Sequence, residues 1–131
     1  VLVGLSEELR QFEYSQRLAR RARNVIAASG QSTGRTLFEA ALRGGAQALG
    51  VADAGLVVGS SADCFSVDMS GPSLCARRDD EVLDSLVFAS SRTPVDCAWV
   101  RGKRLVQAGR HAQREAIARR FQTVMGELQA V

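Results

Sequence analysis

The sequence predicts an α/β chain with helices at both ends and short strands between them, and three observations carry this prediction. Four segments have apolar residues that recur every three or four positions, as helices do. Four short apolar runs have the length of strands, and breaks rich in glycine, serine or proline separate many of the segments. The 131 residues, of which 46% are apolar and 24% charged, are enough for one ordinary domain.

The first helix is expected to begin with Ser6 as its cap and to run to about Ala28. Glu7 and Glu8 then place acids in the first turn, beside the positive end of the helix dipole. The apolar stripe that supports this helix consists of Leu5, Leu9, Phe12, Ala19, Ala22 and Ile26.

A second helix is expected from residue 36. Thr36 and Glu39 have the spacing of a capping box, in which the two side chains satisfy backbone N–H groups at the helix start. Gly50 follows the last apolar position and is expected to end the helix. Gly44 and Gly45 make this helix thin, so it is able to approach another element closely.

The remaining elements are shorter. Strands are expected at residues 56–58 and 62–68, a helix at 81–89, and strands at 95–100 and 104–107. Residues 101–103, with their central glycine, predict a hairpin turn between the last two strands. A final helix follows Gly109, and its apolar stripe consists of Ile117, Phe121, Val124, Met125 and Leu128.

These elements are too few to cover one another. Four short strands make a poor core alone, and the two leading helices need a surface on which to bury their apolar stripes. The chain also begins with Val1 rather than Met, which predicts that residues precede it in the gene product. The sequence is therefore interpreted as one part of a larger folded body.

A complete catalytic site is not expected in this chain. A hydrolytic metal site needs three or four ligands, and the sequence has a single histidine, His111, in a setting typical of a surface or capping residue. No serine-nucleophile, Walker or dinucleotide-binding motif occurs. The acid pairs Glu7–Glu8 and Asp79–Asp80 are expected to act as helix N-terminal charges.

The cysteines and the distribution of charge indicate the cellular compartment and the kinds of binding partner to expect. Cys64, Cys75 and Cys97 are odd in number and lack CxxC spacing, which predicts reduced thiols in a cytoplasmic protein, with Cys64 and Cys97 as small buried side chains. The arginine clusters at residues 17–23 and 119–120 lack interleaved aromatic residues, so a solvated helix face is favoured over a nucleic-acid groove. With no signal peptide and no apolar run near the ~20 residues that span a bilayer, neither nucleic acid nor membrane is expected as a partner.

Several stretches resemble known motifs. GLVVGSSADCFSVD at residues 55–68 and VDCAWVRGKRLV at residues 95–106 are similar to two strand segments of the amidohydrolase superfamily. EELRQFEYSQRL at residues 7–18 and GRTLFEAALRGGAQALG at residues 34–50 are similar to stretches of the formimidoylglutamate deiminases, a family within that superfamily. Since the tail is similar too, the resemblance covers essentially the whole chain.

The resemblance implies the C-terminal part of a (β/α)8 barrel enzyme. Residues 1–50 would be the last helical segments of the barrel domain, residues 51–111 part of a β-sandwich domain, and residues 112–131 a C-terminal helix. One divalent metal, usually zinc, would be held by residues upstream of Val1, so this chain alone is expected to bind no metal and to be inactive. The implied reaction is hydrolysis of N-formimidoyl-L-glutamate to N-formyl-L-glutamate and ammonia, in histidine breakdown. The implied partners are this substrate, the remainder of the barrel and, by analogy, a second copy in a homodimer.

In such a barrel, residues 1–6 would leave the last strand at the face where active sites are built. Glu7, Glu8 and Arg10 are therefore hypothesised to lie at the rim of the site or to support the residues that contact the metal. Two other functions stay open: another aminohydrolase of the superfamily, of the cytosine or guanine deaminase kind, and a non-catalytic structural or interaction module.

Overall fold

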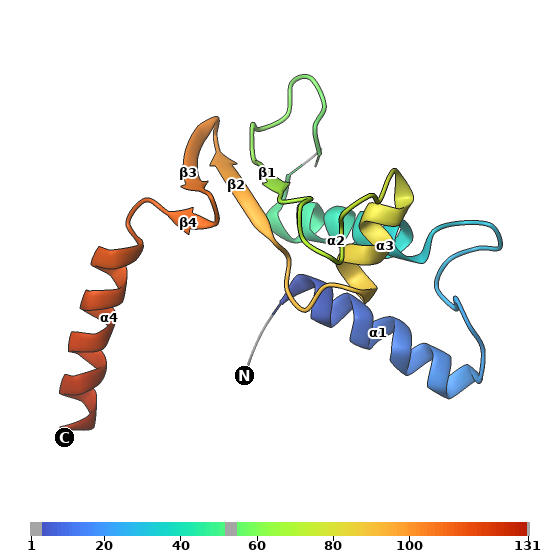
Figure 1. The fold of residues 1–131 in the computed structure, drawn as a ribbon, viewed down its shortest axis with the longest axis horizontal. Coiled ribbons are helices and arrows are strands. Elements are labelled where there is room, and N and C mark those ends of the chain that lie inside the picture. The colour runs from blue at the N-terminus through green and yellow to red at the C-terminus, as the bar shows by residue number, and fades with distance from the viewer. Residues whose placement is uncertain (1–3, 52–54, 131) are drawn as a thin grey trace.

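The protein is described by a computed structural model that covers residues 4–51 and 55–130. In Figure 1, three helices lie together at one end of the molecule, a small sheet occupies the middle, and a fourth helix stands apart at the other end. In chain order the elements are α1 (Leu5–Arg20), α2 (Thr33–Leu49), β1 (Cys64–Val67), α3 (Asp80–Phe88), β2 (Val95–Val100), β3 (Lys103–Gln107), β4 (Arg110–His111) and α4 (Arg114–Gln129).

The sheet is antiparallel throughout, in the order β1-β2-β3-β4. β2 and β3 form the predicted hairpin, in which Val100 pairs with Lys103, and Arg101 and Gly102 have φ angles of 50° and 74°. Two successive residues with positive φ give a tight turn whose twist suits the strands on either side. The short strand β4 was not predicted. The chain is thus an α/β structure with a small antiparallel sheet, which confirms the coarse fold class.

Most of the buried apolar residues lie among the helices. Leu37 of α2, Leu86 and Val87 of α3, and Leu74 in the loop before α3 are buried, whereas in the sheet Cys97 of β2 is buried. Cys64 is half-buried and Cys75 is exposed, so the expected burial of Cys64 is met only in part, and all three thiols are free. The helical end of the molecule therefore holds most of the core of the described residues.

The bounds predicted for α1 were wrong at both ends. The cap is Gly4 rather than Ser6, whose hydroxyl instead lies 2.9 Å from the hydroxyl oxygen of Thr93. The helix ends at Arg20 because Arg21 adopts a left-handed conformation, with φ 49°, and the chain turns back on itself. Of the loop expected at residues 1–6, residues 1–3 lie outside the described residues.

The apolar stripe predicted for α1 faces the core of this chain only in part. Leu5 and Phe12 are 53% and 51% exposed, whereas Ser6 and Glu13, on the adjoining face, are buried. The most deeply buried side chains of α1 are therefore polar, and the helix packs against α3. Leu9 of the stripe is half-buried beside α3, so the apolar side is covered only in part.

The start of α2 was also predicted wrongly. The helix begins one turn earlier than the expected capping box, because Ser32 is the cap and its side chain accepts a hydrogen bond from the backbone N–H of Arg35. Thr36 donates its hydroxyl proton to the carbonyl of Ser32, and Glu39 pairs with arginines of its own helix instead of the backbone. At the other end, Gly50 stops the helix with φ 65°, as predicted.

The strand expected at residues 56–58 does not form. This segment consists of bends and turns between Gly55 and Gly59, which both have positive φ angles, and Leu56 is 84% exposed. The predicted strand at 62–68 is present in shortened form as β1, and the predicted helix at 81–89 is α3.

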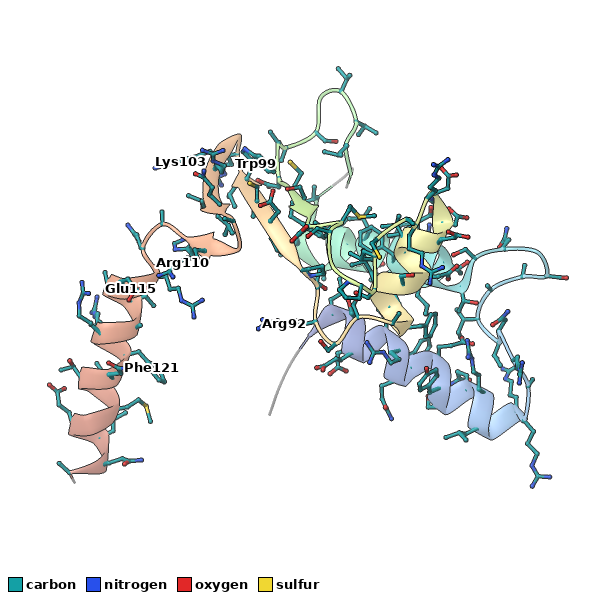
Figure 2. The ribbon with its side chains drawn as sticks, in the orientation of Figure 1. Arg92, Trp99, Lys103, Arg110, Glu115 and Phe121 are labelled. Carbon is teal, nitrogen blue, oxygen red and sulfur yellow. The ribbon has the colours of Figure 1, made fainter. Side chains whose placement is uncertain are left out.

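The last helix, α4, forms as predicted but packs on nothing in the described chain. None of its residues is buried. Figure 2 shows Phe121 projecting from α4 with no neighbouring element beside it. Across the residues that the structure describes, no helix has both the length and the apolar character for a membrane span.

Candidate functional site

The three residues singled out from the sequence, Glu7, Glu8 and Arg10, all lie in the first two turns of α1 but do not form one cluster. Glu7 and Glu8 are exposed. The guanidinium of Arg10 instead turns towards α3, where Nε donates to the carbonyl of Val87 at 2.7 Å and Nη2 to that of Ser90 at 2.5 Å. A cation in contact with the carbonyls at a helix C-terminus is favourable for the helix dipole. Arg10 thus fastens α1 to the end of α3, and the rim role of the three residues stays a prediction.

A buried carboxylate that the sequence did not single out organises the end of α1. Glu13 has no solvent exposure, and its oxygens accept hydrogen bonds from Arg17 Nε at 2.7 Å and from the N–H groups of Val25 and Ile26 at 3.0 and 3.2 Å. Burial alone raises the pKa of Glu13, but these hydrogen bonds and the charge of Arg17 outweigh it and leave the pKa below its ordinary value. Glu13 therefore holds the loop after α1 against the helix as a charged group.

Arg17 differs from the other arginines near it. Its guanidinium carbon lies 5.4 Å from the ring centroid of Tyr14 and 5.2 Å from that of Phe88, a cation–π arrangement that joins α1 to α3. The interpretation of the arginine cluster as a solvated face is correct for Arg20, Arg21 and Arg23, which are exposed, and wrong for Arg17. The four-residue spacing from Glu13 to Arg17 was the available signal.

The start of α2 is held by an acid from α3. Asp84 Oδ1 accepts a hydrogen bond from the N–H of Gly34 at 2.7 Å and another from the hydroxyl of Ser32 at 3.0 Å. Gly34 is buried so tightly against α3 that a Cβ atom there would lie 2.5 Å from the backbone nitrogen of Asp84. The close approach expected of a glycine in α2 thus occurs at Gly34, whereas Gly44 and Gly45 face open space.

The acids of the segment at residues 55–68 act within the sheet and its loops. Asp63 accepts the N–H of Arg101 at 2.6 Å, and the Ser61 hydroxyl at 2.7 Å, so it ties the start of β1 to the β2–β3 turn. The hydrogen bond from the Arg101 N–H is the main reason that the pKa of Asp63 is lowered. Asp68 accepts the N–H of Ser70 at 2.8 Å and closes a local turn. Both acids are therefore explained by structure.

The described residues do not fit a metal centre. No group of three or more His, Cys, Asp or Glu side chains within residues 4–51 and 55–130 is placed to hold an ion. Nδ1 of His111 accepts the N–H of Gln113 at 3.1 Å, so His111 stabilises the turn before α4.

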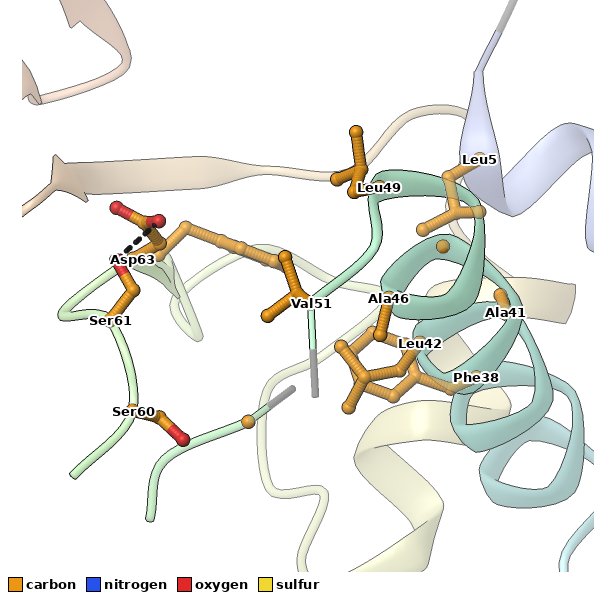
Figure 3. Close-up of a pocket in the computed structure, with 13 residues that line it drawn as sticks. Leu5, Phe38, Ala41, Leu42, Ala46, Leu49, Val51, Ser60, Ser61 and Asp63 are labelled. Carbon is orange, nitrogen blue, oxygen red and sulfur yellow. Dashed lines mark hydrogen bonds between the residues drawn. The ribbon is translucent and has the colours of Figure 1, made fainter. Parts of the chain in front are cut away.

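A hollow lies beside α2 and has a volume of about 360 Å³ (Figure 3). Its apolar lining includes Leu5, Phe38, Leu42, Leu49, Val51 and Phe65. Its polar side chains are Ser60, Ser61 and Asp63, of which the last two are hydrogen-bonded to one another. A ligand site needs a few polar groups that converge on one point, and this hollow is instead an apolar surface beside a helix.

The fold of this chain is similar to one portion of a larger protein of the amidohydrolase class. The chain superposes on the crystal structure of an amidohydrolase from Brucella melitensis with a TM-score of 0.89 and 49% sequence identity, over 98% of this chain and 28% of that one. More particularly, it is similar to the formimidoylglutamate deiminase of Pseudomonas aeruginosa, with 43% identity over 129 residues, which are 98% of this chain and 28% of that protein. No protein-family model matches the chain.

These comparisons confirm the resemblance to the C-terminal portion of formimidoylglutamate deiminases that was inferred from the sequence. The chain spans a little over a quarter of the length of both relatives, 28% in each case.

Proposed function

We propose that this chain is the C-terminal part of a metal-dependent deiminase that hydrolyses N-formimidoyl-L-glutamate to N-formyl-L-glutamate and ammonia. The observation that carries the proposal is the 43% identity to formimidoylglutamate deiminase over 98% of this chain. The alignment spans 129 residues, and so includes both the helical end and the sheet. The reaction would place the protein in cytoplasmic histidine breakdown.

In this proposal the catalytic metal and its ligands belong to the rest of the protein. The described residues do not fit a metal centre, and the family resemblance puts zinc on residues that precede this sequence. Residues 1–50 would be the last helical segments of the barrel, residues 51–111 part of the β-sandwich, and residues 112–131 a C-terminal helix. The exposed apolar side of α1 and the hollow beside α2 support this division, because a barrel would supply the missing cover.

The contribution of this chain to catalysis would be to hold the first turn of α1 in place. Arg10 and Ser6 fasten that turn to the end of α3 and to the loop after it, and Glu13 fixes the other half of the helix. Active-site groups act only when they are held within fractions of an ångström of the productive geometry. Glu7 and Glu8, exposed on this anchored turn, would then lie at the rim of the site.

A substrate panel with the intact protein tests the proposed reaction against the other aminohydrolases of the superfamily. We expect ammonia release from N-formimidoyl-L-glutamate, and none above background from cytosine or guanine. Release from one of the nucleobases alone would replace the deiminase reaction with that of a nucleobase aminohydrolase. No release from any of them would favour the non-catalytic structural module.

The rim role is tested best at Glu8, because Arg10 also has a structural task. We expect Glu8→Gln to lower kcat/KM for N-formimidoyl-L-glutamate by several-fold, with unchanged thermal unfolding. Glu115→Gln, which alters an exposed acid of α4, is the matched control and should leave turnover unchanged. Wild-type turnover in the Glu8 variant would contradict the rim role of Glu8.

A further inference from the structure

The loop between α3 and β2, residues 89–94, passes beside the first turn of α1 (Figure 1). There the hydroxyl oxygens of Ser6 and Thr93 lie 2.9 Å apart and join two positions that are 87 residues apart in the chain. Ser6 is 8% exposed, and no other hydrogen bond within residues 4–51 and 55–130 uses either hydroxyl. The first turn of α1 is therefore joined to the loop through this contact.

The two hydroxyls have few alternative partners. A small cavity of about 20 Å³ lies beside them, and its other lining residues are leucine, valine and phenylalanine side chains of α1, α2, β1 and α3. The cap of α1 is Gly4, so no side chain holds the start of the helix from within. A hydroxyl that loses its partner among apolar side chains is destabilising. Each hydroxyl therefore keeps the other in place.

The backbone on either side holds Thr93 in a fixed position. Pro94 follows it, and a residue before proline is restricted to extended conformations. The carbonyl of Thr93 accepts the N–H of Val95 at 3.0 Å, and the carbonyl of Pro94 accepts the N–H of Asp68, just beyond β1, at 2.8 Å. Threonine is also stiff at χ1, because its Cβ is branched. The sheet thus supports the loop that presents the Thr93 hydroxyl to Ser6.

We propose that Thr93 is a positioning residue for the reaction proposed above, and that it acts through Ser6 on the first turn of α1. This inference rests on the proposed function, in which Glu7 and Glu8 of that turn lie at the rim of the site. Small displacements of an active site slow the reaction, even when their cause lies far from the reacting atoms. In this way the sheet end of the molecule contributes to the geometry of the site.

Steady-state kinetics of the intact protein with N-formimidoyl-L-glutamate test the proposal, at a temperature where every variant is folded. Thr93→Val keeps the shape of the side chain but removes the hydroxyl, and should lower kcat/KM about fivefold, mainly through kcat. Thr93→Ser retains a hydroxyl and should restore most of the turnover. The matched control is Thr36→Val, which removes a hydroxyl that donates to the Ser32 carbonyl at the start of α2 and should leave kcat/KM unchanged.

A double-mutant cycle with Ser6→Ala shows whether Thr93 acts through Ser6. We expect Ser6→Ala to cause a similar loss, and the double variant to lose little more than either single one, because both changes remove the same contact. Wild-type turnover by Thr93→Val, an equal loss in Thr93→Ser, or losses that multiply in the double variant would overturn the role of Thr93 and leave the proposed reaction standing. No ammonia release by the wild type would overturn the proposed reaction, and the role of Thr93 with it.

Discussion

The two ends of this molecule are stabilised in different ways. At the helical end, α1, α2 and α3 surround the larger share of the buried residues, and buried or half-buried polar side chains join the helices to each other and to their loops. At the other end, the sheet is held mainly by backbone pairing, its acid Asp63 is exposed, and α4 has no buried residue. The comparison teaches that interactions within the chain fix the helical end, whereas the sheet and α4 leave surfaces that need a cover from elsewhere.

The sharpest contrast between the two ends is expected at their glycines. A Cβ at residue 34 would lie 2.5 Å from Asp84 N and 2.6 Å from Leu83 C, both backbone atoms of α3. Because this backbone cannot move aside as a side chain can, we expect Gly34→Ala to lower the free energy of unfolding by about 3 kcal/mol. Urea unfolding of the intact protein measures this change.

The matched control is Gly126→Ala in α4, where a Cβ meets nothing within 4 Å. Alanine favours the helix at such a position, so this variant should gain about 0.5–1 kcal/mol. Equal effects at Gly34 and Gly126 would contradict the contrast between the two ends.

The next largest effect is expected at the buried carboxylate. Glu13→Gln removes the charge that Arg17 and two backbone N–H groups solvate, and it should cost about 2 kcal/mol of unfolding free energy. Glu115→Gln removes the carboxylate of the exposed Arg110 pair, and should cost well under 1 kcal/mol. Thermal unfolding of both variants tests whether burial makes the difference.

The same carboxylate gives the molecule a pH dependence of known sign. The folded-state pKa of Glu13 lies below its ordinary value of 4.5, so its charged form stabilises the fold fully above that pH. The contribution is lost as the pH falls through the folded-state pKa. We therefore expect the stability difference between wild type and Glu13→Gln to be constant near neutrality and to shrink below about pH 4.5. A stability difference that grows in acid would mean that the pKa of Glu13 in the folded state is raised above its ordinary value.

A moderate effect is expected where Arg10 holds the end of α3. Arg10→Ala removes hydrogen bonds to the carbonyls of Val87 and Ser90 and should lower the free energy of unfolding by about 1 kcal/mol. Arg92, an exposed arginine labelled in Figure 2, is the control, and Arg92→Ala should change stability by less than about 0.5 kcal/mol. Equal urea midpoints for the two variants would mean that the hydrogen bonds of Arg10 to the end of α3 do not stabilise the fold.

The smallest effect is expected at the sheet end, in the link from Asp63 to the β2–β3 turn. Asp63→Asn keeps one acceptor but loses the charge, and the site is open to water. We expect faster amide hydrogen exchange at Arg101 with nearly unchanged global unfolding. A decrease in the free energy of global unfolding as large as that of Glu13→Gln would contradict the conclusion that backbone pairing holds the sheet.

The elements that the sequence predicted well are those with local signals. The hairpin at residues 101–103, the end of α2 at Gly50 and the short helix α3 depend on neighbouring residues, and the structure has all three. The early end of α1 was missed because its cause is remote in sequence: Glu13 binds backbone groups twelve and thirteen residues further on. The partial exposure of the α1 stripe was not predicted, because periodicity shows that a face needs a cover, but not whether this chain supplies it.

For the candidate site, the sequence predicted a resemblance to formimidoylglutamate deiminases, but no catalytic residues within this chain. Glu7, Glu8 and Arg10 were selected by their position in that resemblance, and the structure shows that Arg10 is engaged with α3. The contacts of Glu13, Asp63 and Asp84 with backbone N–H groups could not be predicted from the sequence, because those groups are twelve or more residues away and no local pattern marks them.

The most direct test of the proposed function is ammonia release from N-formimidoyl-L-glutamate, measured side by side for the intact protein and for the isolated 131-residue chain. We predict steady turnover by the intact protein and none by the isolated chain, since the described residues do not fit a metal centre. Turnover by the isolated chain, or its absence from the intact protein, would contradict the account.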